Sequence, residues 1–296
     1  MVPIIREPIE QADPPRSPRE TLPSMYDLPC EDPEEPGLPD EFHDLQPQLL
    51  SRTLRLTGYT RENCFTASDL NLYYDVKHPL WHKRPDWFLV VDVPRLYDGK
   101  DFRRSYVVWQ EGKHPYVVVE FLSPGTEVED LGRFYHEASK VPDKRAAIPV
   151  SDSLDNGMEQ LTKTTPPGKL EVYERYLRVP HYIVYSRYTQ RLRYFKLDGG
   201  RYQEQPVSQQ NPLIWLADLE IGLGIWQGVF DDVPGYWLRW CDRSGGWLLT
   251  DTEQVQAQLL QAARNLLAAG MEIGQVAEML GLSETQVQAL QVGGDS

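Results

Sequence analysis

Apolar residues gather in short runs through the middle of the chain, and their spacing predicts strands. Residues 87–93 (WFLVVDV) form one run between two prolines, and residues 116–122 (YVVVEFL) form the most apolar one. A continuous β-branched run is typical of a central strand buried on both faces. A long connection joins the two runs, so they are expected to pair as antiparallel strands. Further strands are predicted at residues 68–75, 181–185 and 192–197 and near Tyr202.

Helical spacing of apolar residues frames these strands. A first helix is expected to begin near Asp40 or Glu41, although Pro47 falls in its first two turns. Residues 169–177 (KLEVYERYL) predict an amphipathic helix that Pro180 ends. The order of helix, strands, helix and strands predicts an α/β fold with a mixed central sheet flanked by helices. A C-terminal helical extension follows it.

Composition divides the chain into three parts. Residues 1–39 are acidic and rich in proline, which predicts an extended segment with little buried apolar surface. An α/β domain is expected over residues 40–250 and a helical region over residues 251–296. Within the latter, residues 271–291 resemble a helix-turn-helix hairpin but contain three glutamates and no Lys or Arg. Contact with another protein is therefore favoured over DNA reading by that hairpin.

The distribution of net charge bears on whether the protein could bind nucleic acid. The total of −14 argues against nucleic acid, because cations supply most affinity for phosphate. Residues 1–50 carry −9 and residues 250–296 carry −5, however, so residues 51–249 sum to zero. Residues 169–201 hold eight Lys and Arg against three acids. Both a local basic face and ordinary solvated charges fit this stretch.

Several classes of protein are excluded or disfavoured. The sequence contains no run of about 18 apolar residues, so no membrane span is predicted. The N-terminus lacks the pattern of a secretion signal. The three scattered cysteines form no CxxC pair, which favours reduced thiols in a cytoplasmic protein. No phosphate loop, zinc spacing or serine–histidine–acid pattern is visible. The tryptophans of residues 213–249 alternate with aliphatic residues, which favours packing over a base-stacking platform.

Candidate chemistry centres on two acids. Glu120 lies inside the most apolar strand, where a carboxylate is costly unless it is paired or bound to metal. A salt bridge with a core-facing Lys or Arg is the alternative. Asp86 opens the preceding strand, so antiparallel pairing would bring it beside Glu120. Two carboxylates suit Mg²⁺ or Mn²⁺, and Lys169 at the helix start could contact the water or the phosphate.

Three strings resemble a known family when they are taken together: RPDWFLVVDV, VVVEFLSPGTEVEDLG and KLEVYERYLRVPHYIVYS. They are similar to the Uma-two family, whose members are predicted restriction endonucleases of the PD-(D/E)XK nuclease superfamily. The resemblance covers roughly residues 40–250 and implies a restriction-endonuclease-like core that hydrolyses phosphodiester bonds in DNA with a divalent metal. It implies that Asp86 and Glu120 are metal ligands, that Lys169 is the catalytic lysine, and that Ser123 and Tyr173 have supporting roles.

One departure from the superfamily pattern concerns the lysine. The pattern places it two residues after the second acid, where this chain has Leu122. The resemblance implies that the lysine has moved to Lys169, with Lys163 and Lys140 as fallback candidates. Because the superfamily includes inactive members, a regulatory or protein-binding module that keeps the fold is the alternative function. A homodimer is expected for a nuclease, since two symmetric sites can cut both strands.

Overall fold

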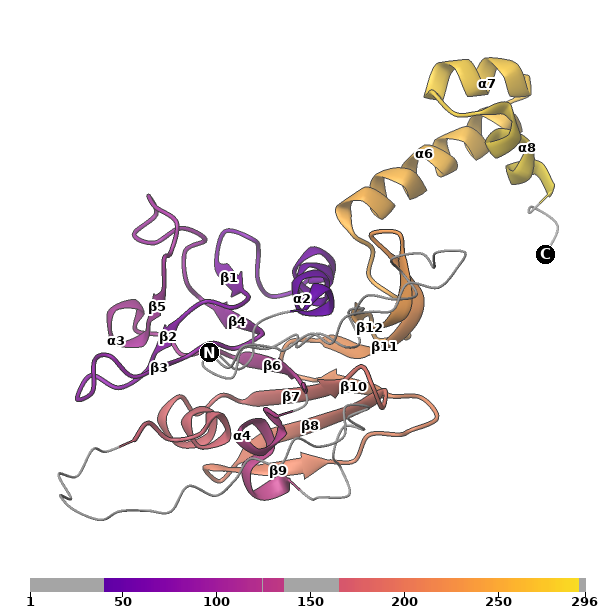
Figure 1. The fold of residues 1–296 in the computed structure, drawn as a ribbon. Helices are drawn as coiled ribbons and strands as arrows, with labels where there is room; N and C mark the ends of the chain where they lie inside the picture. Colours follow the sequence, from indigo (N-terminus) through magenta and orange to yellow (C-terminus); the bar gives the residue numbers. More distant parts are fainter. Residues whose placement is uncertain (1–39, 124, 136–164, 293–296) are drawn as a thin grey trace, which may run out of the picture.

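The centre of the molecule is a six-stranded mixed sheet (Figure 1). The computed structural model describes residues 40–123, 125–135 and 165–292. The strand order is β1-β4-β6-β7-β8-β9, in which β6 and β7 are parallel and all other neighbours are antiparallel. The strands are β1 Cys64–Ala67, β4 Trp87–Val91, β6 Val117–Phe121, β7 His181–Ser186, β8 Arg191–Asp198 and β9 Arg201–Gln205. This arrangement confirms the mixed sheet predicted from the apolar runs.

One face of the sheet is covered by a helix and a second sheet. The helix α2 (Glu41–Thr53) packs there beside an antiparallel sheet of β10 (Leu213–Leu216), β11 (Ile221–Phe230) and β12 (Val233–Cys241). Trp237 and Trp240 are buried in this layer, which confirms that these tryptophans pack rather than stack bases. Strands β11 and β12 are the long strands of this second sheet, with 10 and 9 residues, and β10 has 4.

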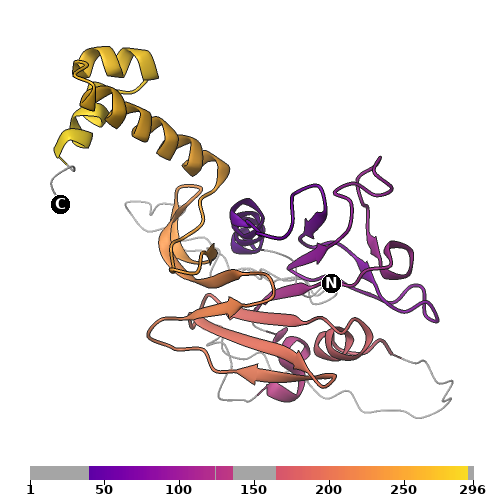
Figure 2. The same ribbon diagram turned by 180° about the vertical axis from the view of Figure 1, so that it is seen from behind.

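The opposite face carries short helices and a small third sheet, as the view from behind also shows (Figure 2). Alternating residues of β6 separate the two layers: Val117 and Val119 face α2, while Val118 and Glu120 face the other side. The elements on this second face are α4 Glu127–Leu131, η1 Gly132–Phe134, α5 Lys169–Glu171, the π-helix η3 Val172–Tyr176, β2 Leu72–Tyr73, β3 His82–Lys83, β5 Tyr106–Val107 and α3 Val108–Glu111.

The strand expected over residues 68–75 is only partly present, whereas the first helix is present as expected. The strand expected over residues 68–75 shrinks to β2, because Asp69 adopts a left-handed backbone (φ 52°) that interrupts the extended run. Leu72 and Tyr74 are nevertheless buried in one core, as their alternation indicated. The first helix is confirmed: Asp40 caps α2 by accepting from His43 N at 3.1 Å, and the helix continues through Pro47.

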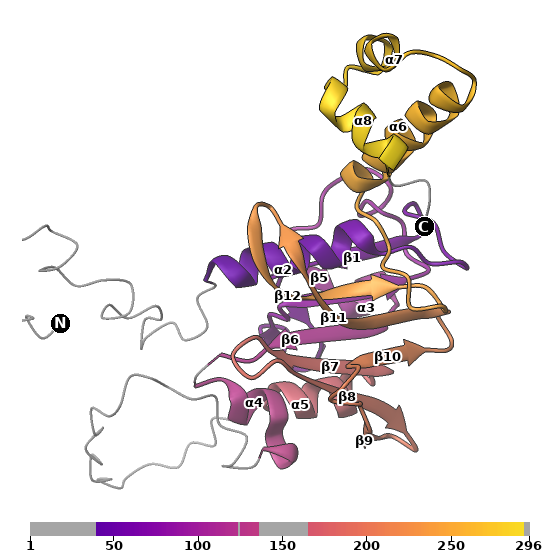
Figure 3. The same ribbon diagram turned by 90° about the vertical axis from the view of Figure 1, so that its right-hand side faces the viewer.

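Three helices follow the sheets and project away from them (Figures 1 and 3). Helix α6 (Asp251–Ala268) starts with a capping box between Thr250 and Glu253. Helices α7 (Ile273–Leu280) and α8 (Glu284–Val292) fold back on α6 around a small apolar core. The C-terminal helical extension is therefore confirmed. No helix in the described part of the chain is long and apolar enough to cross a membrane.

Candidate active site

The register of β4 and β6 brings Asp86 beside Glu120. The strands run antiparallel with Trp87 opposite Val119, so one further step places the two acids opposite each other. Asp86 Oδ2 accepts from the backbone N of Phe121 at 2.5 Å, and the backbone N of Asp86 lies 3.4 Å from Glu120 Oε2. The antiparallel pairing expected from the two apolar runs is present.

Glu120 is completely buried, and both of its carboxylate oxygens have partners. Oε1 accepts from the Tyr173 hydroxyl at 2.6 Å, and Oε2 accepts from Lys169 Nζ at 3.0 Å. Burial raises the pKa of Glu120 well above its usual range, although the ammonium opposes this shift. The core-facing cation considered as the alternative partner of Glu120 is thus Lys169 itself.

Asp130, on α4, is a third acid at the site, and sequence reasoning missed it. Its side chain is 1% exposed, and its Oδ1 lies 3.0 Å from Lys169 Nζ. Burial raises the pKa of Asp130. Two carboxyl groups, those of Glu120 and Asp130, therefore contact one ammonium, and the charge of Asp86 acts on it from further away. We call Asp86, Glu120, Asp130 and Lys169 the carboxylate cluster. Its surplus of negative charge favours uptake of a cation or of a proton.

Lys169 is held charged by these neighbours. Burial alone would lower its pKa, but the charges of Asp130 and Glu120 outweigh burial and raise it well above its usual value. Gly132 packs against Leu170, the residue after the lysine: its φ is +47°, and a Cβ on it would lie 2.7 Å from Leu170 Cδ2. A glycine is therefore needed where the end of α4 meets the start of α5.

The segment after Lys169 is a π-helix rather than the continuous α-helix expected over residues 169–177. The backbone N of Leu177 donates to Val172 O, five residues earlier, at 2.9 Å. The wider turn occurs around Tyr173, whose hydroxyl contacts Glu120. Single π-helical turns are frequent at functional sites. Tyr173 thus donates a hydrogen bond directly to Glu120, and its supporting role in catalysis stays a prediction.

His43 is a second residue that the sequence did not indicate. Its Nδ1 lies 2.8 Å from Asp40 Oδ1, and its Nε2 lies 3.3 Å from the carbonyl oxygen of Phe121. Both partners are acceptors, so the ring satisfies both only when it is doubly protonated. Burial would lower the pKa of His43, but Asp40 and Asp86 raise it above the usual value. No spacing in the first helix singled out this residue.

A pocket of about 420 Å³ opens onto the cluster. Asp86, Lys169 and His43 line it, whereas Glu120 lies behind the wall. Ser123 also lines the pocket, but its hydroxyl contacts Thr126 Oγ1 at 3.2 Å rather than a carboxylate. The pocket is therefore a place where a phosphate group could reach an acid and a fixed ammonium together.

The donor set fits a magnesium-type ion. No three His, Cys, Asp or Glu side chains among the described residues converge into a complete metal site. Magnesium, however, is usually held by one or two carboxylates with water and substrate phosphates. Asp86 and Glu120 supply two such hard oxygen donors, and Asp86 Oδ1 has no hydrogen-bond partner within the described ranges. The surplus negative charge of the cluster favours the same ion.

Other predicted cations contribute less than expected. Lys140 and Lys163 lie outside the described residues. In the stretch 169–201, Arg193 is buried and paired with Glu204, and Arg187 is paired with Asp40. These arginines stabilise the fold and do not form a free basic face.

The chain matches one known protein family. The family model Uma2, described as putative restriction endonuclease, matches residues 18–226, which is more than half of the 296 residues. The matched segment contains all four members of the carboxylate cluster. No curated protein and no solved structure matches. The mixed sheet is consistent with a restriction-endonuclease-like fold, and the chain belongs to the Uma2 family.

Proposed function

We propose that this protein is a metal-dependent endonuclease that hydrolyses phosphodiester bonds in DNA. The observation that carries the proposal is the meeting of Asp86, Glu120 and Lys169, with Asp86 and Lys169 lining one pocket, in a member of the Uma2 family. Covalent catalysis would require a different set of residues, namely a nucleophile with an adjacent base. A phosphate diester is an anion, and the pocket offers it a fixed cation.

Each residue of the candidate site has a distinct role in the proposed reaction. Asp86 and Glu120 would hold Mg²⁺ or Mn²⁺, which lowers the pKa of bound water and neutralises charge on the phosphate. Lys169 remains an ammonium, because its pKa is raised. It would therefore stabilise negative charge on the phosphate rather than take a proton from water. Tyr173 fixes one oxygen of Glu120 and so orients the other.

Cleavage assays test this proposal. Plasmid and single-stranded DNA would be incubated with Mn²⁺ or Mg²⁺ and either wild type or Glu120→Ala. We expect cleavage by wild type only. The matched control is Glu171→Ala, since Glu171 is an exposed carboxylate near Lys169 that pairs with Arg175 at 2.9 Å. This control should cleave normally. Equal cleavage by Glu120→Ala and wild type would remove the proposed site.

A catalytically inactive module is the second candidate function. It is favoured by the fact that both oxygens of Glu120 already have protein partners and that no three-ligand metal group is found in the described ranges. In that case wild type would bind neither Mn²⁺ nor Mg²⁺ and would leave both DNA substrates intact. Partner capture would then become the activity to measure.

Assembly is a further part of the proposal. A homodimer would place two carboxylate clusters on one duplex, and the C-terminal helices, poor in cations, would contact a protein. Sedimentation of wild type and of a variant that ends at residue 250 would test both expectations. A monomer in each case would contradict them.

A further inference from the structure

An exposed hairpin beside the active-site pocket carries cations and no acid beyond its first residue. We call residues 75–84 (DVKHPLWHKR) the arm; it follows β2 and contains β3. Its cations are Lys77, Lys83 and Arg84, and it also holds two histidines. In a protein of net charge −14, nine consecutive residues without an acid (76–84) are a local positive feature.

The arm has a defined shape although its tip buries little. The backbone N of His78 donates to Asp75 O at 3.1 Å, and that of Trp81 donates to His78 O at 2.8 Å. The rings of His78 and Trp81 stack with centroids 3.8 Å apart and an interplanar angle of 9°. Pairing of β3 with β2 anchors the base of the arm. The backbone of the arm and this ring pair are therefore ordered before any partner arrives.

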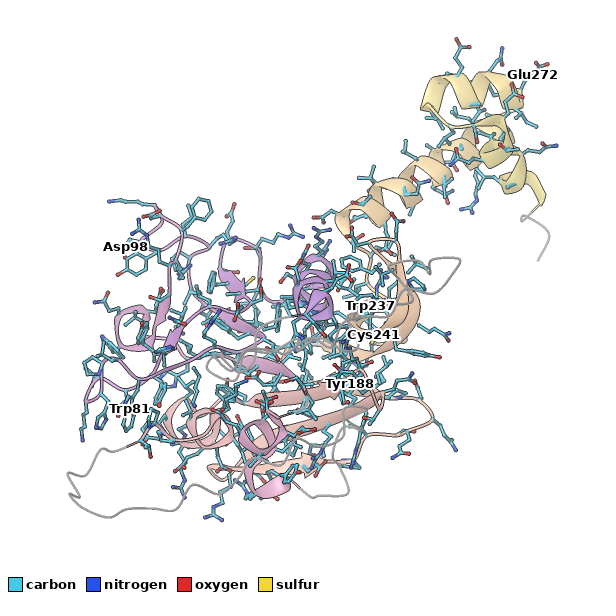
Figure 4. The ribbon with its side chains drawn as sticks, in the orientation of Figure 1. Trp81, Asp98, Tyr188, Trp237, Cys241 and Glu272 are labelled. Atoms are coloured by element: carbon cyan, nitrogen blue, oxygen red, sulfur yellow. The ribbon has the colours of Figure 1, made fainter. Side chains whose placement is uncertain are left out.

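Apolar side chains at the tip face solvent. Leu80, next to Pro79, is 82% exposed, and Val76 is 65% exposed. Figure 4 shows Trp81 at the outer edge of the molecule, far from the C-terminal helices. A single exposed leucine is ordinary. Here it stands among cations on a rigid turn, and that combination suits contact with nucleic acid: cations bind phosphates, and apolar side chains enter a groove or meet bases.

The arm is continuous with the active-site pocket. His82, Lys83 and Arg84 line the same pocket as Asp86 and Lys169. Lys83 is paired with Glu129 at 2.5 Å and Arg84 with Asp69 at 2.6 Å, whereas Lys77 forms no salt bridge with any described residue. A DNA strand that reaches Lys169 would therefore pass along the arm, with Lys77 as its outermost cation.

We propose that the arm is the DNA-contacting element of this protein. Lys77 and Arg84 bind backbone phosphates on the way to the pocket, and Leu80 contacts the groove or a base at the tip. This inference rests on the proposed nuclease function, because it names the surface that holds the substrate of that site. The arm is expected to set affinity and to leave the chemical step unchanged, since none of its tip residues contacts the carboxylate cluster.

The test measures binding and cleavage separately in the full chain. Fluorescence anisotropy in EDTA would follow labelled duplex and single-stranded DNA with wild type, Lys77→Ala and Leu80→Ser. Both changes lie at exposed positions and should leave thermal unfolding unchanged. We expect Lys77→Ala to reduce the slope of log affinity against log salt by about 1 and Leu80→Ser to weaken binding about fivefold, as for half-burial of a leucine side chain. With Mn²⁺ present, KM should rise and kcat should stay constant.

The matched control is a double change, Lys100→Ala with Phe102→Ala, on another exposed loop. It removes one cation and one large apolar side chain that is 75% exposed. If both arm variants cleave normally and bind DNA with unchanged affinity, the proposal that the arm contacts DNA is overturned, while the proposed nuclease function stands. Weakened binding without any cleavage by wild type would support the arm and count against catalysis. A changed oligomeric state with unchanged DNA affinity would make the tip a protein contact and overturn the inference.

Discussion

Two polar clusters lie at opposite ends of the parallel strands β6 and β7, and they differ in charge balance. The carboxylate cluster is near the ends of these strands. The histidine cluster, which consists of Tyr116, His181, Tyr194 and Asp218, is near their starts. Val117 pairs with His181, so the clusters are separated by three residues of strand, roughly 10 Å.

The hydrogen-bonding groups of the histidine cluster find their partners within the cluster. Asp218 accepts from the Tyr116 hydroxyl at 2.5 Å and from His181 Nε2 at 2.9 Å. His181 Nδ1 is then free to accept from Tyr194, whose hydroxyl lies 2.7 Å away. A neutral imidazole meets every partner, and burial lowers the pKa of His181 in agreement with this assignment. A closed network of this kind stabilises a fold.

The carboxylate cluster is not balanced in the same way. Three acids act on the charge of one ammonium, which two of them contact, and a pocket opens beside the cluster. Burial raises the pKa of Glu120 and of Asp130, which shows that the fold alone does not favour their charged forms. Burial of a polar group therefore does not mark function by itself. Surplus charge with access from solvent distinguishes the candidate active site.

The largest effect on stability is expected from Lys169→Met. This change leaves buried carboxylates without their ammonium, which costs about 3–5 kcal/mol for a broken buried pair. The loss should be smaller at pH 5 than at pH 8, because carboxyl groups with raised pKa can then take up protons. Urea unfolding at both pH values measures it. Lys196→Met, at an exposed position, is the control, and an equal loss in both variants would refute the prediction.

A smaller effect, without loss of activity, is expected from Asp218→Ala. The change removes the acceptor shared by Tyr116 and His181, and an unsatisfied buried donor costs about 1–2 kcal/mol. Water can reach part of the site, because the Asp218 side chain is 42% exposed. Urea unfolding and plasmid cleavage should be measured on the same preparation. Loss of cleavage at unchanged stability would show that the two clusters are wrongly assigned.

The smallest expected effect is on the pH dependence of stability, which should have opposite signs for His43 and His181. The pKa of His43 is raised above 6.5, so its stabilisation is present below pH 6.5 and is lost as pH rises through the folded-state pKa. The pKa of His181 is lowered, so its stabilisation is present above pH 6.5 and is lost as pH falls through the folded-state pKa.

Unfolding of His43→Gln and His181→Gln in EDTA measures these signs. The difference between wild type and His43→Gln should be larger at pH 5.5 than at pH 8.5. The difference for His181→Gln should follow the opposite order. Parallel pH curves for the two variants would contradict the proton assignments.

Much of the sheet and half of the site could be predicted from sequence. Long apolar runs identified β4 and β6, and the cost of a buried carboxylate singled out Glu120. The strand β1 was missed because four residues (CFTA) carry too short a pattern to read. The short β2 was overextended because nothing in the alternation indicated the left-handed backbone at Asp69.

The missing half of the site depends on tertiary contacts. Asp130 stands in a run of three acids (EVED) on a five-residue helix, and periodicity over so short an element does not say which acid turns inward. His43 is placed by the packing of α2 against the end of β6. The sequence pattern shows neither the π-helical turn at Tyr173 nor the close packing of Gly132 against Leu170 just before it.

Metal binding tests the central claim most directly, namely that the carboxylate cluster and not the histidine cluster is the active site. Isothermal titration with Mn²⁺ would compare wild type, Glu120→Gln and Asp218→Asn. We predict that wild type and Asp218→Asn bind Mn²⁺ equally and that Glu120→Gln binds it more than about 100-fold more weakly. Equal binding by wild type and Glu120→Gln, or no binding by wild type, would contradict the claim.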